Sequence, residues 1–302
     1  QSTNAVAIGD EAGQNAQGTH SIAVGHDAGK TTQGTRSIAM GKGAGQTNQG
    51  EYSVALGNLA GNSGQLVSSV AIGDSAGQTN QGTLSVAIGA DAGTTSQATK
   101  SVAVGNLAGN TGQSAWTVAV GDEAGRTDQG ILAISVGKKA GTTIQGDNSV
   151  SIGYLAGNSS QLVSSVAIGK SAGETTQGTL SVAMGFETGK TSQGANSVAI
   201  GNLAGNDSQL VSSVAIGDSS GQTDQGTLAV AVGKDAGKTS QGANSVAMGN
   251  LAGNSGQLVS SVAIGNSAGQ ITQGTLSVAI GNLAGNTSQG TTSVALGSGS
   301  GQ

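Results

Sequence analysis

The stretch SVAIG (Ser69–Gly73) decides the fold, because close variants of it recur along the whole chain. Its closing glycine falls at Gly9 and then at every sixteenth residue up to Gly297, which gives nineteen copies without insertion or deletion. Each repeat of such an array buries its face only against its neighbours. The sequence therefore predicts one continuous repeat domain over residues 1–302, and we expect this segment to be a fragment of a longer chain.

Apolar residues alternate within the repeated stretch in the pattern of a β-strand. Val or Ile stands three places before the glycine, another apolar residue stands directly before it, and Ala lies between them in nearly every copy. Apolar positions two residues apart share one face of a strand, and β-branched residues favour strands. We expect this Val and Ile face to point into a coil. The residues assigned to the coil core are Val70, Ile72, Val86, Ile88, Val198 and Ile200.

The Ala column then belongs to the opposite, outward face of the same strand. Nineteen rungs at about 4.8 Å would make this column ~90 Å long. Exposed apolar patches of such a size mark interfaces. We expect an identical chain to pack against the column, and the residues assigned to this inter-chain packing are Ala55, Ala71, Ala87 and Ala199.

The second half of each repeat predicts a further strand. After the glycine come two variable polar positions, then Ala-Gly, and then usually Thr followed two places later by Gln. Stacked in register, the Gln amides would form a ladder from rung to rung. The residues assigned to this ladder are Gln65, Gln81, Gln97 and Gln193. The fold predicted is all-β, a parallel β-solenoid or β-roll with sixteen residues per coil and about nineteen coils.

A second period of 48 residues lies over the first. The sequence Asn-Leu-Ala-Gly-Asn begins at Asn58, Asn106, Asn202 and Asn250, and a variant of it occupies the remaining place in the series. One explanation is duplication of a block of three repeats. The other is a contact that recurs at every third rung, about 14 Å apart.

Composition excludes several classes of function. The chain has 55 Gly, no Pro and no Cys, and a net charge of -5 with 9% charged residues. Neither a nucleic-acid partner nor membrane insertion fits such a chain. The Gly-Lys-Thr sequence at residues 29–31 is one residue short of a phosphate-binding loop. His20 and His26 occupy variable positions, so we predict no metal, no cofactor and no catalytic site, and hence no enzyme.

Three glycosylation sequons also occur in the second half of the repeat. In a sequence this rich in Asn, Ser and Thr, chance explains them. They begin at Asn158, Asn206 and Asn286.

With these columns defined, the stretch Asn-Ser-Val-Ala-Ile-Gly at residues 196–201 resembles the head repeats of trimeric autotransporter adhesins of the YadA type. The resemblance implies a left-handed parallel β-roll in which three chains form a fibre-like head that binds host surfaces. It also implies that Val198 and Ile200 point into the coil and that Ala199 lies toward the sister chains. Similar 16-residue repeats occur in fibre-like proteins of large viruses and phages.

The function expected is a structural and adhesive fibre at the surface of a cell or virion, outside the cell. Its partners would be identical chains, as a trimer, and a receptor on a host or other cell. The alternative is a filament that grows by end-to-end docking of coils. An ice-binding solenoid is a weaker alternative, because the Thr column is interrupted at Asn15, Ser63, Asp207 and Ile271.

Overall fold

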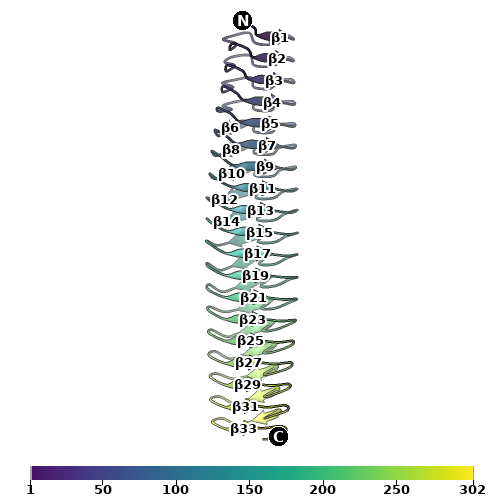
Figure 1. Cartoon of the computed structure of the whole chain (residues 1–302), viewed down its shortest axis with the longest axis vertical. Coiled ribbons are helices and arrows are strands. Elements are labelled where there is room, and N and C mark those ends of the chain that lie inside the picture. Colours follow the sequence, from purple (N-terminus) through teal and green to yellow (C-terminus); the bar gives the residue numbers. More distant parts are fainter. Residues whose placement is uncertain (1, 302) are drawn as a thin grey trace. The chain divides into compact units, whose positions relative to one another are not determined.

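The computed structural model describes residues 2–301 as an all-β parallel solenoid, which confirms the predicted fold class. One coil takes sixteen residues, since Val70 pairs with Val86 and Thr79 pairs with Thr95. The chain divides into two compact units, residues 1–149 and residues 150–302. Within each unit the strands lie one above another in coil order (Figure 1).

The strand of the SVAIG type contributes three residues to every coil. Successive strands pair in parallel and in register, so that Ala71 lies beside Ala87. In residues 1–149 these strands are β1 (Val6–Ile8), β2 (Ile22–Val24), β3 (Ile38–Met40), β4 (Val54–Leu56), β5 (Val70–Ile72), β7 (Val86–Ile88), β9 (Val102–Val104), β11 (Val118–Val120) and β13 (Ile134–Val136). In residues 150–302 they are β15 (Val150–Ile152), β17 (Val166–Ile168), β19 (Val182–Met184), β21 (Val198–Ile200), β23 (Val214–Ile216), β25 (Val230–Val232), β27 (Val246–Met248), β29 (Val262–Ile264), β31 (Val278–Ile280) and β33 (Val294–Leu296).

A second parallel sheet is formed by the strands that end at Gln. In the first coils it consists of isolated bridges such as that between Gln17 and Gln33. In residues 1–149 its strands are β6 (Thr79–Gln81), β8 (Thr95–Gln97), β10 (Thr111–Gln113), β12 (Thr127–Gln129) and β14 (Thr143–Gln145). In residues 150–302 they are β16 (Ser159–Gln161), β18 (Thr176–Gln177), β20 (Ser192–Gln193), β22 (Asp207–Gln209), β24 (Thr223–Gln225), β26 (Thr239–Gln241), β28 (Ser255–Gln257), β30 (Ile271–Gln273) and β32 (Thr287–Gln289).

Two corners join the strands within each coil. The first corner follows the SVAIG strand, as at Asp74 and Ser75, and the return corner leads from Gln back to the next strand, as at residues 82–84. Both corners use left-handed backbone, with φ of 53° at Ser75 and 58° at Leu84. Such φ values are costly for most L-residues. Asn, Asp and Ser share these positions with Leu, Glu and Lys.

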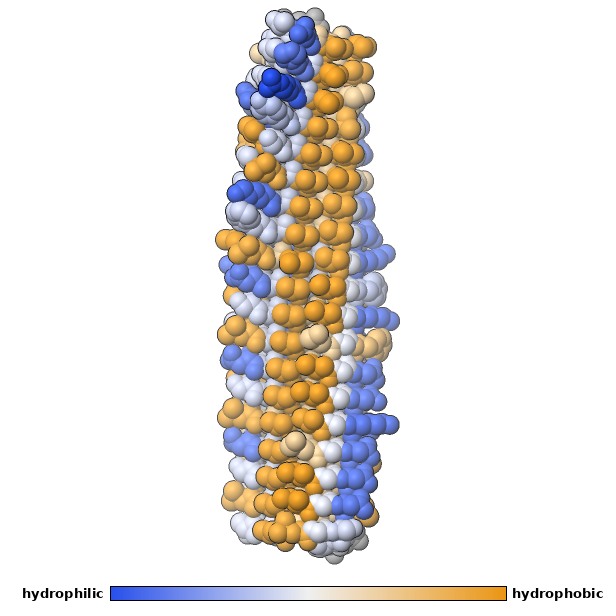
Figure 2. Space-filling model, viewed as in Figure 1, coloured by the Kyte–Doolittle hydropathy of each residue, from blue (hydrophilic) through white to orange (hydrophobic). Residues whose placement is uncertain are grey.

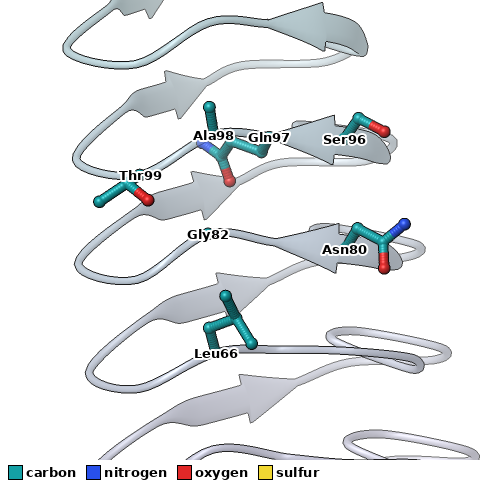
Figure 3. A pocket seen from close by; sticks show the side chains of 7 residues that line it. All are labelled: Leu66, Asn80, Gly82, Ser96, Gln97, Ala98 and Thr99. Carbon is teal, nitrogen blue, oxygen red and sulfur yellow. The ribbon is translucent and has the colours of Figure 1, made fainter.

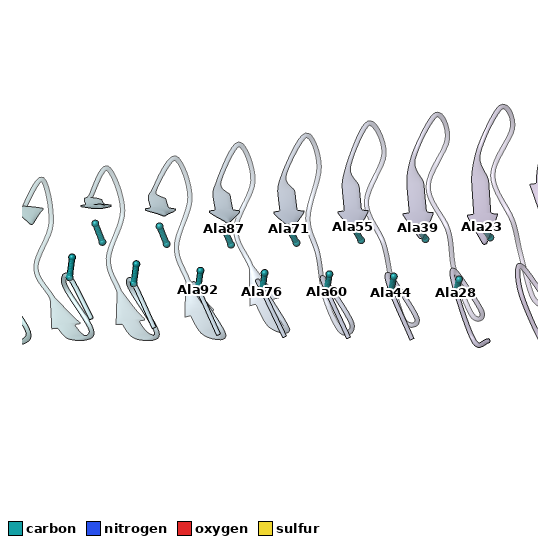
Figure 4. Close-up of a cluster of buried hydrophobic side chains, with 14 residues drawn as sticks. Ala23, Ala28, Ala39, Ala44, Ala55, Ala60, Ala71, Ala76, Ala87 and Ala92 are labelled. Atoms are coloured by element: carbon teal, nitrogen blue, oxygen red, sulfur yellow. The ribbon is translucent and has the colours of Figure 1, made fainter. Parts of the chain in front are cut away.

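The interior of the coil is only as wide as facing methyl groups allow. Ala71 from the strand and Ala76 from the first corner are fully buried, and Figure 4 shows these two Ala columns facing each other. A Cβ atom on Gly77 would lie 3.2 Å from the Ala71 Cβ atom and 2.7 Å from the Gln81 Oε1 atom. The second glycine of the repeat is therefore required both by this close approach and by its φ of 53°.

This geometry overturns the predicted assignment of the two strand faces. The alternation of the strand is as expected, but Ala55, Ala71, Ala87 and Ala199 are fully buried inside their own coils and are not available for inter-chain packing. The branched side chains lie on the outer face, and they are half-buried or exposed there. The residues wrongly assigned to the coil core are Val70, Ile72, Val86, Ile88, Val198 and Ile200. The physical reason is size, because the interior has no room for branched aliphatic side chains from this strand.

Buried Gln side chains connect the two sheets. Gln81 is fully buried, and its Nε2 atom donates a 2.7 Å hydrogen bond across the coil to the carbonyl oxygen of Val70. The same bond, from Gln to the residue eleven positions earlier, recurs from Gln17 to Gln289. A charge-free hydrogen bond of this kind contributes about 1 kcal/mol net. Repetition in coil after coil makes these bridges a major link between the two walls.

The predicted amide-to-amide Gln ladder is confirmed only in part. Gln65 accepts a 3.3 Å hydrogen bond from Gln49, as a ladder requires. In contrast, the Oε1 atoms of Gln81, Gln97 and Gln193 are buried without a hydrogen-bond partner. The bond across the coil fixes the orientation of each amide, and this orientation does not always bring Nε2 to the next Oε1.

Two coils show how the buried oxygen can be satisfied. Where Ser replaces the strand Ala, the Ser135 hydroxyl donates to Gln145 Oε1 and the Ser151 hydroxyl donates to Gln161 Oε1. Both Ser side chains are fully buried. A hydroxyl at this position therefore fits the coil and finds an acceptor in the Gln of the same coil.

We predict that the buried Ala does not tolerate a larger apolar side chain, whereas the outward residue beside it tolerates substitution. Ala199→Val is expected to destabilise its coil by about 1–3 kcal/mol through overpacking, since a Cβ on Gly205 would already lie 3.2 Å from Ala199. Ile200→Val, on the outer face, is expected to change stability by less than about 0.5 kcal/mol. Amide hydrogen exchange of residues 197–212 measures both, and the reverse order would contradict the assignment of faces.

We also predict that Ala71→Ser stabilises its coil by about 1 kcal/mol, because the new hydroxyl gives the buried Gln81 Oε1 atom a donor. The check is a double-mutant cycle in which the same substitution is made with Gln81→Leu. The gain should vanish in that background. A gain of equal size in both backgrounds would show that the hydroxyl acts through some other contact.

Candidate functional site

The outer face of the SVAIG sheet carries an extended apolar surface in each unit. Two apolar side chains per strand point outward, and Figure 2 shows them as two adjacent columns. Ile88 and Ile200 each remain 37% exposed, even though neighbours from the adjacent coils flank them. In residues 150–302 alone, ten strands place twenty such side chains on one face. Contiguous apolar patches of this extent mark interaction surfaces in soluble proteins.

The first corner next to this face is mostly polar and is held together by contacts between coils. Asn58 donates a 2.7 Å hydrogen bond to Asp74 in the next coil, and Asn202 donates in the same way to Asp218 at 2.8 Å. Lys138 lies 3.3 Å from Asp122. Ion pairs this exposed contribute little to stability, so the corner serves mainly as a solvated edge.

The N-terminal coils concentrate charge at this corner. Lys30 donates to Glu11 and, at 3.0 Å, to Asp27. These two hydrogen bonds raise the pKa of the Lys30 ammonium above its usual value, and the bond to Glu11 has the larger effect. The bond from Lys30 is also the main cause that lowers the pKa of Asp27. The pKa of Asp122 is lowered as well, first by the Asn106 amide and then by Lys138. Salt should weaken this surface cluster.

The return corner on the other side of the apolar face carries the aromatic residues of residues 2–132. Trp116 is 53% exposed, and the Lys100 Nζ atom lies 4.0 Å from its ring centre. Arg36 stacks on Tyr52 one coil further along and donates a 2.9 Å hydrogen bond to its hydroxyl. Each pair joins residues sixteen positions apart, so these stacks couple neighbouring coils.

The structure also has a shallow hollow at the return corner, which spans three coils. Its lining is Leu66, Asn80, Gly82, Ser96, Gln97, Ala98 and Thr99. Figure 3 shows the reason for the hollow, since Gly82 has no side chain between Leu66 and the coil of Ala98. No charged group lines it. It therefore lacks the convergent polar groups of a small-molecule site.

The motifs considered as chemical sites lie in ordinary corners. Lys30, Lys190 and Lys238 of the Gly-Lys-Thr stretches pair with carboxylates, at 3.3 Å from Lys190 to Glu187 and 2.9 Å from Lys238 to Asp235. His26 contacts Asp27 at 3.1 Å. Among residues 2–301, no group of three or more His, Cys, Asp or Glu is arranged to hold a metal ion.

The side chains of the sequon asparagines contribute to the coil structure. Asn206 donates a 2.7 Å hydrogen bond to the carbonyl oxygen of Glu187, and Asn286 donates to Gln270 Oε1 at 2.9 Å. Equivalent asparagines such as Asn110 bond to a first-corner carbonyl nineteen residues earlier. These amides therefore stabilise the first corner of the preceding coil, a role that their spacing in the sequence could have indicated. In the part of the chain that the structure describes, no helix is long and apolar enough to cross a membrane.

The outward apolar face is a candidate interaction surface, and alternation alone assigned its residues wrongly to the coil interior. The signal for it was present in the second half of the repeat. A fixed Ala-Gly pair four residues after the strand and a fixed Gln leave the interior no space for branched side chains.

Comparison with known proteins gives one match. A family model described as the YadA head domain repeat matches two copies, at residues 1–28 and residues 16–44. Neither the curated proteins nor the solved structures give a significant match. The matched copies share their strand, glycine and Gln positions with all later coils. The first 44 residues are thus similar to repeats of the YadA head type.

Proposed function

We propose that this chain is a segment of a trimeric adhesive fibre, in which the outward Val and Ile columns of three parallel chains face one another. The observation that carries the proposal is the apolar face itself. In the isolated chain its branched side chains are left at the surface, while the coil interior is already filled. Burial of such a face against sister chains gains about 25 cal/mol for each Å² of apolar surface removed from water.

The size and evenness of the face support association between identical chains. Twenty outward side chains in residues 150–302 correspond to the roughly 20–30 residues that each partner brings to a stable interface. The columns carry no charged residue. Three chains related by rotation would each contribute the same face and enclose a common apolar core.

The corners and the second sheet then face outward, and we propose that they make the adhesive contacts. The variable charged residues lie at the first corner, and exposed polar residues such as Thr95 and Ser96 lie on the second sheet. In this role the fibre lies at a surface outside the cell and binds a receptor on another cell, as the YadA-type match suggests. The fibre itself needs no catalytic group for this function.

The first test is the mass of the full chain in solution over a concentration series, measured by sedimentation. We expect a trimer whose mass does not change with concentration. A variant with Ile200→Lys, Ile216→Lys, Ile264→Lys and Ile280→Lys should be a folded monomer, because charge would be buried at the interface. The matched control adds four lysines to the second sheet, as Thr191→Lys, Thr239→Lys, Ser255→Lys and Thr287→Lys, and should remain a trimer.

A folded monomer of the unaltered chain at all concentrations would refute the trimer. Species that grow without limit as concentration rises would indicate the end-to-end filament instead. A trimer that survives the four lysines on the Val and Ile face would show that another surface joins the chains.

The adhesive role is tested separately with beads that carry the full chain. We expect such beads to adhere to cells, and adhesion should fall at least tenfold when the charged first-corner residues are replaced by Asn. Adhesion equal to that of uncoated beads would refute the receptor contact while leaving the trimer untouched.

A further inference from the structure

The 48-residue period places apolar residues on both corners of the same coil. In the coil of β21, Leu203 lies at the first corner, and Leu210 and Val211 lie at the return corner. Leu228 follows at the return corner of the next coil, where its backbone nitrogen donates to the carbonyl oxygen of Val211. The equivalent sets are Leu59, Leu66, Val67 and Leu84; Leu155, Leu162, Val163 and Leu180; and Leu251, Leu258, Val259 and Leu276.

The leucines stand where the backbone disfavours them. Leu203 has a φ of 54° and Leu228 a φ of 59°, which is left-handed backbone that costs a bulky L-residue conformational energy. In coils between the apolar sets, Ser219 and Asn244 occupy the same corner positions with nearly the same φ. Leu228 is 56% exposed, so packing within its own chain does not offset the cost.

We propose that these leucines set the register between copies of this chain. In a parallel assembly built by rotation, the first corner of one chain faces the return corner of the next. Leu203 of one copy then packs against Leu210, Val211 and Leu228 of its neighbour. The inference rests on the proposed association through the Val and Ile face. The return corner directly precedes the strand that carries this face.

The occupant follows from the spacing. A partner must present apolar groups at intervals of three coils, about 14 Å, on a surface as regular as this one. A second copy of the same chain has that interval by construction, on the complementary corner and at the same level. A slip by two coils would instead place Leu203 against Ala243 and Asn244 of the return corner.

The test uses disulfide cross-linking, because the chain has no Cys of its own. Full-length chains carrying Leu203→Cys are coexpressed with chains carrying Val211→Cys and then oxidised. The matched control replaces Val211→Cys by Ala243→Cys, which lies at the same corner position two coils further along. We expect mixed dimers with Val211→Cys at least tenfold more abundant than with Ala243→Cys, and few dimers of Leu203→Cys alone.

Three results would overturn the inference. Dimers of Leu203→Cys with itself would indicate that the first corners of two chains meet each other. Equal cross-linking to Ala243→Cys would indicate that the chains slip freely past one another. Absence of any cross-link in an assembled sample would indicate that the two corners are not in contact. Each of these leaves the Val and Ile interface standing. If sedimentation finds only monomer, the proposed function fails first and the register contact fails with it.

A second measurement separates register from folding. Leu228→Asn suits the left-handed backbone, so the coil should be no less resistant to hydrogen exchange. The dissociation constant of the assembly should rise at least tenfold when Leu84, Leu180, Leu228 and Leu276 are all replaced by Asn. Asn244→Ser is the control and should change neither quantity. Unchanged association in the four-leucine variant would contradict the proposal.

Discussion

The close approach of the two walls of each coil is the constraint on which the rest of the structure depends. At Gly77 the backbone comes so near the strand that an added Cβ would meet Ala71 at 3.2 Å. Only small residues fit between the walls at this point, and the Gln81 side chain crosses from the second sheet to the first. Each coil is therefore held by parallel ladders, facing methyl groups and one amide bridge, without a core of large side chains.

This constraint inverts the usual distribution of apolar residues. In most domains the branched aliphatic residues are buried and the small ones are spread more widely. Here the smallest apolar residue fills the interior, and Val and Ile form the outer face. The isolated chain thus forms its two sheets and the Gln bonds between them while leaving an apolar surface uncovered. Folding of the coil and burial of Val and Ile are separate events, and the second requires another molecule.

Much of the fold could be predicted from the sequence, because an unbroken period fixes the coil length and alternation fixes the strand. The faces could not be assigned from alternation alone, since period two separates Ala71 from Val70 and Ile72 without saying which side is inside. The deciding information lies in the other half of the repeat. Gly77 and Gln81 limit the space inside the coil. Their effect depends on the distance between the two walls, which cannot be derived from a local sequence pattern. The hydrogen bond from Gln81 to the Val70 carbonyl could not be predicted either, because it also depends on the distance between the two walls.

The left-handed corner positions hold different residues from coil to coil, and this bears on the 48-residue period. Duplication of a three-coil block explains why the apolar corners recur at equal spacing. It does not explain why the ancestral block would hold leucine at left-handed positions on both corners, where Ser, Asp or Asn costs less. A contact between neighbouring copies supplies that reason, because each leucine then gains burial that exceeds its backbone cost. The same contact needs a leucine on each corner of one coil, which is the arrangement of Leu203 and Leu210.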